Sequence, residues 1–462
     1  MFPALTNPSG KEAIRFGDRA LTYERLAGVA GAIAAELPGD RVAVWATPTL
    51  HTSVAVVAAL LAGVPAVPLN PKIGERELGH ILADSEPSIV LVEPGVTLPD
   101  GLAAVPRVDI DLTGDLRELP AEADDEAPAL IVYTSGTTGP PKGVVLPRRA
   151  ITSTLDALED AWQWTADDVL VHALPLFHVH GLILGILGPL RRGGSVRHLG
   201  RFTTEGIARE LAGGATMMFG VPTMYHRIAG EVASNTALAD ALRGARLLVS
   251  GSAALPVHDH ELITEATGQQ VVERYGMTET LMNTSVRADG ERKPGTVGVP
   301  LPGVELRLVG DAELGEIQVR GPNLFTEYLN RPDATAEAFE DGWFRTGDMA
   351  TRDADGYVKI VGRKATDLIK SGGYKIGAGE IENALLEHPG VAEVAVTGEP
   401  DPDLGERIVA WVVPSGAEPP LEELASHVAR LLSPHKRPRV VRYLTELPRN
   451  DMGKVMKRAL HA

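Results

Sequence analysis

The sequence contains no cysteine, so disulfide bonds, thiolate metal sites and a cysteine nucleophile are excluded. Any thiol chemistry would need a thiol that a substrate brings. The chain also lacks an excess of positive charge, because its formal net charge at pH 7 is −17. That balance argues against binding to nucleic acid or to an anionic membrane surface. Basic residues for any anionic ligand must therefore be concentrated locally.

Long hydrophobic runs are missing as well. The longest runs from Val54 to Val67, and Gly63 and Pro65 interrupt it, so it is too short and too broken to span a bilayer. Residues 1–8 have neither the basic nor the apolar region of a signal peptide. We therefore expect a cytoplasmic protein that does not act at a membrane.

Helical and strand-like segments alternate along most of the 462 residues, a length that predicts roughly two to four domains or subdomains. The expected helices cover residues 21–37, 54–63, 75–84, 150–162 and 204–212, and the expected strands cover 41–45, 66–70, 88–92, 169–174, 216–220 and 247–250. This alternation is typical of an α/β layer with parallel strands.

The sequence pattern changes near residue 294, where short β-rich runs alternate with glycine turns as far as residue 362. We therefore expect an α/β protein with a large N-terminal domain over residues 1–362. It would comprise α/β subdomains at about 1–150 and 151–293 and a β-rich, barrel-like subdomain at about 294–362. Residues 363–462 predict a small, mobile C-terminal α+β domain.

One polar stretch, from Tyr133 to Gly143, lies between two apolar runs and predicts strand, loop, strand. Its hydroxyls, glycines and lysine suit a phosphate, since glycine lets the backbone approach an anion and Lys142 adds a charge. It is not a Walker A loop, because Gly143 follows the lysine where Ser or Thr is required. Taken alone, the loop is equally consistent with an ordinary turn.

The whole string resembles the phosphate loop of the adenylate-forming enzymes, which include acyl-CoA synthetases, luciferases and peptide-synthetase adenylation domains. Further motifs match this family in the same order over nearly the whole chain. The resemblance implies that ATP is bound, with phosphate contacts from Thr134, Ser135, Gly136, Thr137, Thr138, Gly139 and Lys142. Thr138 is a second, weaker candidate for a Mg²⁺ ligand.

The string from Glu273 to Thr280 matches the family's Tyr-Gly-x-Thr-Glu motif. Tyr275, followed by Gly276, can stack on a purine. Thr278 can donate to a phosphate, and Glu279 is a hard oxygen ligand suited to Mg²⁺. A solvated helix start would explain Thr278 and Glu279 but not the whole string. The resemblance implies catalytic roles for these last two residues.

Two further strings resemble nucleotide-binding motifs of the family. The loop after residue 250 resembles the adenine-side loop, which implies roles for Ser252, Ala253 and Ala254. The string from Gly342 to Asp348 implies that Asp348 accepts the ribose hydroxyls. Arg363 would lie beside the ribose and the α-phosphate.

The segment from Leu174 to Gly181 carries His178 and His180, which are too few for a metal site without nearby carboxylates or cysteine. A loop without a function is the simple alternative. The segment resembles the acid-pocket motif of acyl-CoA synthetases. That resemblance implies that the two histidines bind the acid, with His180 also a catalytic candidate.

Arg274 is unusual, because an arginine facing an acyl pocket is unfavourable without an anionic partner. Its guanidinium suits a carboxylate bidentately. One carboxylate of the substrate must react with ATP, so Arg274 would hold a second one, unless it pairs with a local Asp or Glu. We therefore expect a short dicarboxylic acid.

The residues around Arg274 resemble the malonyl-CoA and methylmalonyl-CoA synthetases. Val179 and Met282 are candidates for the wall beside the α-carbon, and Gly251 also belongs to this expected site. One methylene is worth only about 1–3 kcal/mol in such a pocket, so a loose wall would accept both acids.

The C-terminal hundred residues carry two more motifs. Residues 370–382 resemble the segment that lines the CoA thiol tunnel, which implies CoA contacts from Lys370, Ser371, Gly372 and Gly373. The basic cluster 435–439, including Arg437, could meet the 3′-phosphate of CoA or be a solvated turn. Ala365 stands where relatives usually have a charged hinge residue.

Residues 447–455 resemble the catalytic-lysine motif and place Lys454 at the acid carboxylate and α-phosphate, with Lys457 as the nearby alternative. Lys454 is also a plausible target for a lysine acyltransferase and a deacylase.

The reaction implied by the resemblance has two steps. An acid attacks Mg·ATP to give an acyl-adenylate and pyrophosphate, and after domain alternation CoA displaces AMP. A synthetase for another short acid, a stand-alone adenylation domain that loads a carrier protein, and a nucleotide-binding regulator without turnover are the alternatives.

Overall fold

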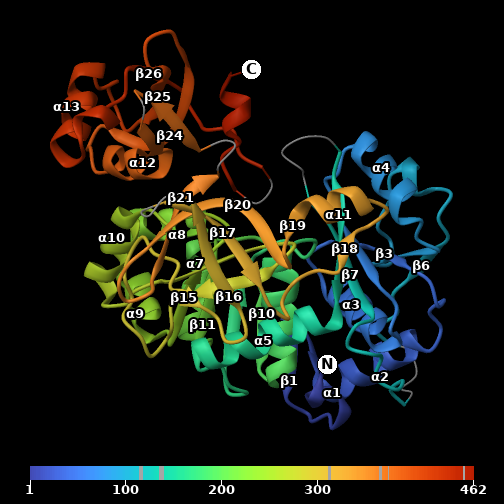
Figure 1. Cartoon of the computed structure of the whole chain (residues 1–462). Helices are drawn as coiled ribbons and strands as arrows, with labels where there is room; N and C mark the ends of the chain where they lie inside the picture. Colours follow the sequence, from blue (N-terminus) through green and yellow to red (C-terminus); the bar gives the residue numbers. More distant parts are fainter. Residues whose placement is uncertain are drawn as a thin grey trace.

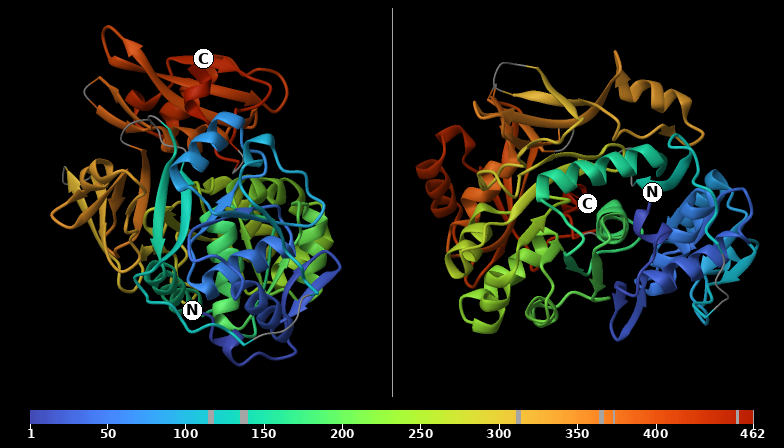
Figure 2. Two further views of the ribbon diagram at one scale, coloured as in Figure 1. Left: turned by 90° about the vertical axis from the view of Figure 1, so that its right-hand side faces the viewer. Right: turned by 90° about the horizontal axis from the view of Figure 1, so that it is seen from below.

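A computed structural model describes residues 1–113, 118–134, 140–310, 314–363, 367–372, 374–450 and 453–461. The chain builds a large N-terminal body, and the C-terminal segment stands above one end of it (Figure 1). The left-hand view of Figure 2 shows the same separation, with the C-terminal helices and strands set apart from the α/β layers. The expected α/β architecture, with a large domain followed by a small one, is confirmed.

The first sheet has seven strands, in the order β18-β8-β7-β4-β3-β5-β6. Its bounds are β3 Val42–Trp45, β4 Ala66–Leu69, β5 Ile89–Val92, β6 Arg107–Asp109, β7 Pro128–Thr134, β8 Lys142–Pro147 and β18 Glu327–Tyr328. The strands from β6 to β7 are parallel, whereas β8 is antiparallel to β7 and to β18. β3 and β4 are buried along their whole length, as apolar strands covered on both faces must be.

Three helices accompany this sheet: α2 (Tyr23–Ala34), α3 (Leu50–Ala62) and α4 (Glu75–Ser85). Thr22 caps α2, because its side chain accepts a hydrogen bond from the Arg25 N–H at 3.2 Å. α3 is mostly apolar and is buried from Leu50 to Leu60, including its polar residues His51, Thr52 and Ser53. α4 is amphipathic and buries only one face, so its other groups remain available for loops nearby.

The second sheet has nine strands, in the order β15-β14-β13-β12-β11-β9-β10-β1-β2. Its bounds are β1 Glu12–Phe16, β2 Arg19–Thr22, β9 Val169–His172, β10 Ser195–His198, β11 Met217–Gly220, β12 Leu247–Ser250, β13 Val272–Met277, β14 Leu281–Ser285 and β15 Val299–Pro300. The centre is parallel and both edges are antiparallel. The hairpin β1–β2 joins this sheet although it comes from residues 12–22, and the subdomain boundaries stay a prediction.

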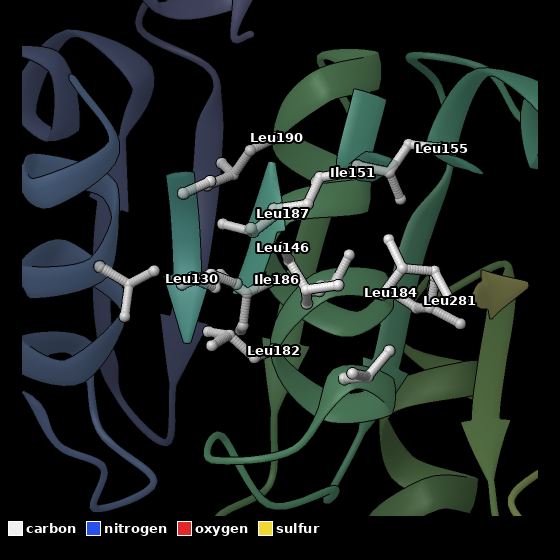
Figure 3. Packing of buried hydrophobic residues seen from close by; sticks show 14 of the residues in the cluster. Leu130, Leu146, Ile151, Leu155, Leu182, Leu184, Ile186, Leu187, Leu190 and Leu281 are labelled. Atoms are coloured by element: carbon white, nitrogen blue, oxygen red, sulfur yellow. The ribbon is translucent and has the colours of Figure 1, made fainter. Parts of the chain in front are cut away.

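The helices of this region are α5 Arg148–Trp162, α6 Gly188–Arg192, α7 Thr204–Ala212, α8 Pro222–Val232, α9 Thr236–Gly244 and α10 Val257–Thr267. A π-helix, η2 (His180–Leu187), precedes α6. Its leucines and isoleucines pack with Leu130 and Leu146 of the first sheet and with Leu281 of the second (Figure 3). The core between the two sheets therefore fixes the segment that begins with His180.

A third, antiparallel unit contains β16 Glu305–Gly310, β17 Gly315–Arg320, β19 Phe339–Glu340, β20 Trp343–Arg352 and β21 Val358–Arg363, with α11 Pro332–Ala338. The C-terminal sheet contains β22 Leu368–Ser371, β23 Tyr374–Gly377, β24 Val391–Asp401, β25 Gly405–Pro414 and β26 Val440–Tyr443, with helices α12 Ala378–Leu386 and α13 Leu421–Leu431. The remaining short helices are α1 Pro3–Thr6, η1 Asp100–Leu102, η3 Pro434–Lys436 and η4 Lys457–His461.

Within the part of the chain that the structure describes, none of the helices has the length and apolar character needed to cross a bilayer.

Candidate active site

The expected phosphate loop connects two paired strands, as the sequence predicts. Thr134 at the end of β7 lies opposite Lys142 at the start of β8, whereas Ser135, Gly136, Thr137, Thr138 and Gly139 lie outside the described residues. Gly143 makes room for the ring of Tyr133, because a Cβ at residue 143 would lie 2.9 Å from Tyr133 Cζ. The Tyr133 hydroxyl donates to Asp84 Oδ2 at 2.8 Å, which ties this strand to α4.

Thr278 and Glu279 lie in the turn of the β13–β14 hairpin, not at a helix start. Gly276 is required there, because a Cβ would lie 1.7 Å from the Leu281 carbonyl oxygen across the hairpin. Glu279 is nearly buried and accepts a hydrogen bond from the Tyr328 hydroxyl at 2.8 Å. Burial raises the pKa of the Glu279 carboxyl, although the charges of Arg363 and Lys142 oppose that shift.

The predicted ribose pair is assembled by neighbouring strands. Asp348 on β20 lies opposite Arg363 on β21, and Arg363 Nε is 2.9 Å from Asp348 Oδ1. The Tyr275 hydroxyl donates to Asp348 Oδ2 at 2.6 Å. Tyr275, Asp348 and Arg363 therefore converge, although they are far apart in the sequence.

Arg274 lies at the centre of the expected acid site and keeps only 5% of its surface exposed. Its Nε and Nη2 atoms have no hydrogen-bond partner among the described residues. Burial lowers the pKa of Arg274 to about 9, so the guanidinium stays charged at neutral pH. No described carboxylate forms an ion pair with it, so the alternative of a local Asp or Glu partner does not hold. A buried cation in this state requires an anionic ligand.

Two histidines face this cation. Burial first, and then the Arg274 charge, lower the pKa of His178 to about 4, and the same two causes hold the pKa of His180 well below its usual value. Both imidazoles are therefore neutral at pH 7. The His180 Nδ1 atom lies 3.3 Å from Ser252 Oγ, while its Nε2 has no partner among the described residues. The arrangement offers a cation and neutral hydrogen-bond donors to one acid.

The candidate wall residues Val179 and Met282 are both buried, at the start of η2 and on β14. Gly251 lies against Arg274, and Ser252 has a left-handed backbone with φ of 73°. Ala253 and Ala254 are exposed beside it, which suits a loop that receives a flat ring. The roles of these residues in binding the acid and adenine stay predictions.

The structure separates the two C-terminal lysines. Lys457 pairs with Glu382 at 2.7 Å and with Asp367 at 3.2 Å, so it has a structural role. The side chain of Lys454 is exposed, and the charges of Arg363, Asp367 and Asp348 act on it. Hydrogen bonds between Asn450 and Lys454 close the turn that carries it. The charges of Asp348 and Arg363 therefore act on Lys454, whereas Lys457 is held by its own ion pairs, and the catalytic role of Lys454 stays a prediction.

The expected CoA residues lie in the C-terminal part, and their role stays a prediction. Lys370 is exposed on β22, its backbone N–H donating to Glu406. Ser371 is buried, and Gly372 has φ of 59°. Arg437 is exposed after η3. Gly373 and Ala365 lie outside the described residues.

Sequence reasoning missed two buried groups beside the site. Tyr328 contacts both Glu279 and Lys142. Glu273 accepts hydrogen bonds from the N–H groups of Leu255 and Gly295, at 3.1 and 3.2 Å. The glutamate stands inside a motif that was recognised, so its burial on a strand could have been suspected. No motif in the sequence around Tyr328 indicated its contacts with Glu279 and Lys142.

Metal binding rests on Glu279 alone among the described residues, which contain no cluster of three His, Cys, Asp or Glu side chains able to hold a metal. Its buried carboxylate fits a hard cation, and the charge of Lys142, a predicted phosphate-binding residue, acts on it.

Comparisons with known proteins identify the family of the chain. The AMP-binding enzyme family matches residues 3–329, and the AMP-binding enzyme C-terminal domain matches residues 380–454. A malonate–CoA ligase from Arabidopsis thaliana is 42% identical over 346 residues, which cover 67% of this chain and 56% of that protein. The chain spans less than two thirds of the length of the curated relatives it matches.

Two solved structures are similar over nearly the whole chain. A malonyl-CoA ligase in a ternary product complex with methylmalonyl-CoA and AMP is 71% identical and covers 97% of this chain and 100% of that one, with a TM-score of 0.77. ATP-bound MatB from Rhodopseudomonas palustris is 35% identical and covers 100% of this chain and 98% of that one, with a TM-score of 0.91. The family match over residues 3–329 and these relatives show that the chain belongs to the AMP-binding enzyme family of adenylate-forming enzymes.

Proposed function

We propose that this protein is an ATP-dependent acid–CoA ligase that forms AMP and activates malonate or methylmalonate. The observation that carries this proposal is the buried guanidinium of Arg274, which has two unpartnered nitrogen atoms and two neutral histidines beside it. An acid with one carboxylate would leave that cation unpaired after its carboxylate turned to ATP. The similar malonate–CoA ligases support the same substrate class.

The adenylation step follows from the converging groups. Asp348 and Arg363, which pair with each other, would hold the ribose, and Lys142 with the predicted phosphate loop would hold the β- and γ-phosphates. Glu279, with Thr138 as a weaker candidate, would hold Mg²⁺, which neutralises charge on the triphosphate. Arg274 fixes one carboxylate of the acid, and this directs the other toward the α-phosphorus. Positioning and charge stabilisation then replace a covalent nucleophile.

Lys454 completes this half-reaction, because its charge lies near Asp348 and Arg363, where the α-phosphate would stand. The higher TM-score to the ATP-bound relative than to the more identical product complex supports an adenylate-forming arrangement here. We propose that the C-terminal domain then rotates and presents residues 370–373 to the acyl-adenylate, so that the CoA thiol displaces AMP. Lys454 is exposed, so its acylation as a regulatory event is also proposed.

The test is pyrophosphate release by the wild-type protein with malonate, methylmalonate, succinate, acetate, octanoate and coumarate. Malonate or methylmalonate should give the highest kcat/KM. Addition of free CoA, compared with a phosphopantetheinylated carrier protein, then separates the ligase from an adenylation domain that loads a carrier. Faster turnover with acetate or octanoate than with malonate would overturn the proposal.

A further inference from the structure

Tyr328 lies between the β13–β14 turn, which carries Glu279, and strand β8, which begins with Lys142. It lies on β18, a strand of two residues that pairs with β8 and sets Tyr328 opposite Val144. The backbone on either side holds both neighbours: the Phe325 N–H donates to the Glu279 carbonyl at 2.8 Å, and the Leu329 N–H donates to the Gly143 carbonyl at 2.7 Å. This segment therefore bridges two loops that are otherwise distant in sequence.

The side chain of Tyr328 makes two different contacts from one rigid ring. Its hydroxyl donates to Glu279 Oε1 at 2.8 Å, and Lys142 Nζ lies 4.5 Å from the centroid of its ring. The ring is 6% exposed, so both contacts are shielded from water. One aromatic residue thus contacts both the carboxylate of Glu279 and the ammonium group of Lys142.

Glu279 and Lys142 are close enough for the lysine charge to act on the carboxyl, yet these two described residues form no ion pair with each other. A direct ion pair would use up the charges that a triphosphate and its cation need. Tyr328 contacts both groups, Glu279 through its hydroxyl and Lys142 through its ring face.

We propose that Tyr328 is a positioning residue that keeps Glu279 and Lys142 apart and directs them toward the triphosphate of ATP. The hydroxyl orients the carboxylate of Glu279, and the ring face holds the ammonium group of Lys142. The inference rests on the proposed function only in taking ATP as the ligand. It does not depend on which acid is activated.

The variants Tyr328→Phe and Tyr328→Leu separate the two contacts. The phenylalanine keeps the ring under Lys142 and removes the hydroxyl, whereas the leucine removes both. Tyr23→Phe is the matched control, because Tyr23 is also buried and its hydroxyl donates to the Gly194 carbonyl at 2.7 Å, outside the site. ATP binding is measured by calorimetry with and without Mg²⁺, together with the kcat and KM of pyrophosphate release and the melting temperature.

Tyr328→Phe is expected to bind metal-free ATP as the wild type does, but to gain less affinity from Mg²⁺ and to lose about tenfold in kcat, since a hydrogen bond to a charged group is removed. Tyr328→Leu is expected also to bind metal-free ATP several-fold more weakly, because the ring under Lys142 is gone. Tyr23→Phe should change only the melting temperature.

The inference is overturned if Tyr328→Phe binds Mg·ATP and turns over like the wild type, or if both Tyr328 variants lose only melting temperature, as the control does. The binding assays need no acid substrate, so the proposal on Tyr328 can fail or stand independently of the malonate proposal.

Discussion

The guanidinium of Arg274 lies directly against Gly251. A Cβ at residue 251 would come within 2.3 Å of Arg274 Cζ and 2.4 Å of its Nε. Real Cβ contacts are not this short, so the position of the arginine depends on a glycine on the neighbouring strand end. The backbone of residue 251 is not left-handed, so glycine is needed here for space and not for conformation.

Gly251→Ala is therefore expected to displace Arg274 and to reduce kcat/KM for malonate roughly 30-fold, equivalent to about 2 kcal/mol. The loss should be much smaller for acetate, which has no second carboxylate to bind. Steady-state pyrophosphate release with both acids measures it. Gly79→Ala is the control, because a Cβ at this exposed position on α4 meets nothing within 4 Å. Equal losses of kcat/KM for malonate and acetate would show that Gly251 has no part in binding the second carboxylate.

Glu273→Gln should change how stability depends on pH. Burial raises the pKa of the Glu273 carboxyl from 4.5 to about 7 in the folded protein, against hydrogen bonds from Leu255 and Gly295 that lower it. Between these values the folded state binds more protons than the unfolded state, so the stability that this group contributes is full below pH 4.5 and is lost as pH rises through 7.

Glutamine does not titrate. The free energy of unfolding of the Glu273→Gln variant, relative to that of the wild type, should therefore rise by about 3 kcal/mol between pH 4.5 and 8. Any fixed cost of placing an amide beside two N–H donors cancels in this comparison. Urea unfolding of both proteins at several pH values measures it. A difference that is flat with pH would show that Glu273 does not titrate in this range.

Lys454→Ala and Lys457→Met should have different effects on catalysis and on stability. Lys454→Ala is expected to reduce adenylation by a factor of about 100 or more, since a charge at the transition state is lost, yet to form thioester from supplied acyl-adenylate and CoA. Lys457→Met breaks the ion pairs with Glu382 and Asp367 and should mainly lower the melting temperature. Comparable loss of both half-reactions in Lys454→Ala would contradict its assignment.

The sequence predicted those parts of the structure that depend on local pattern. Helices α4 and α7 and strand β12 lie where periodicity and apolar runs place them. The nucleotide motifs were recognisable because each is a contiguous string. The hairpin that carries Glu279 was harder, since Thr-Glu also suits a helix start, and long-range pairing with β14 decided the outcome.

Contacts between residues far apart in the chain could not be predicted from the sequence pattern. Tyr328 lies on a strand of two residues, too short to show any alternation, and it meets Glu279 49 residues away. The π-helix η2 looks like an ordinary apolar run in the sequence, and its leucines and isoleucines pack in the core between the two sheets. The unpaired state of Arg274 could only be established once every neighbouring carboxylate had been placed.

The most direct test of the account is the ratio of kcat/KM for malonate to that for acetate in pyrophosphate release, measured for the wild type and for Arg274→Met. Methionine keeps much of the buried volume of arginine and removes the cation. We predict that the wild type prefers malonate and that Arg274→Met loses that preference by at least about 100-fold, because a buried charge pair is lost. A malonate preference that survives in Arg274→Met would contradict the central claim.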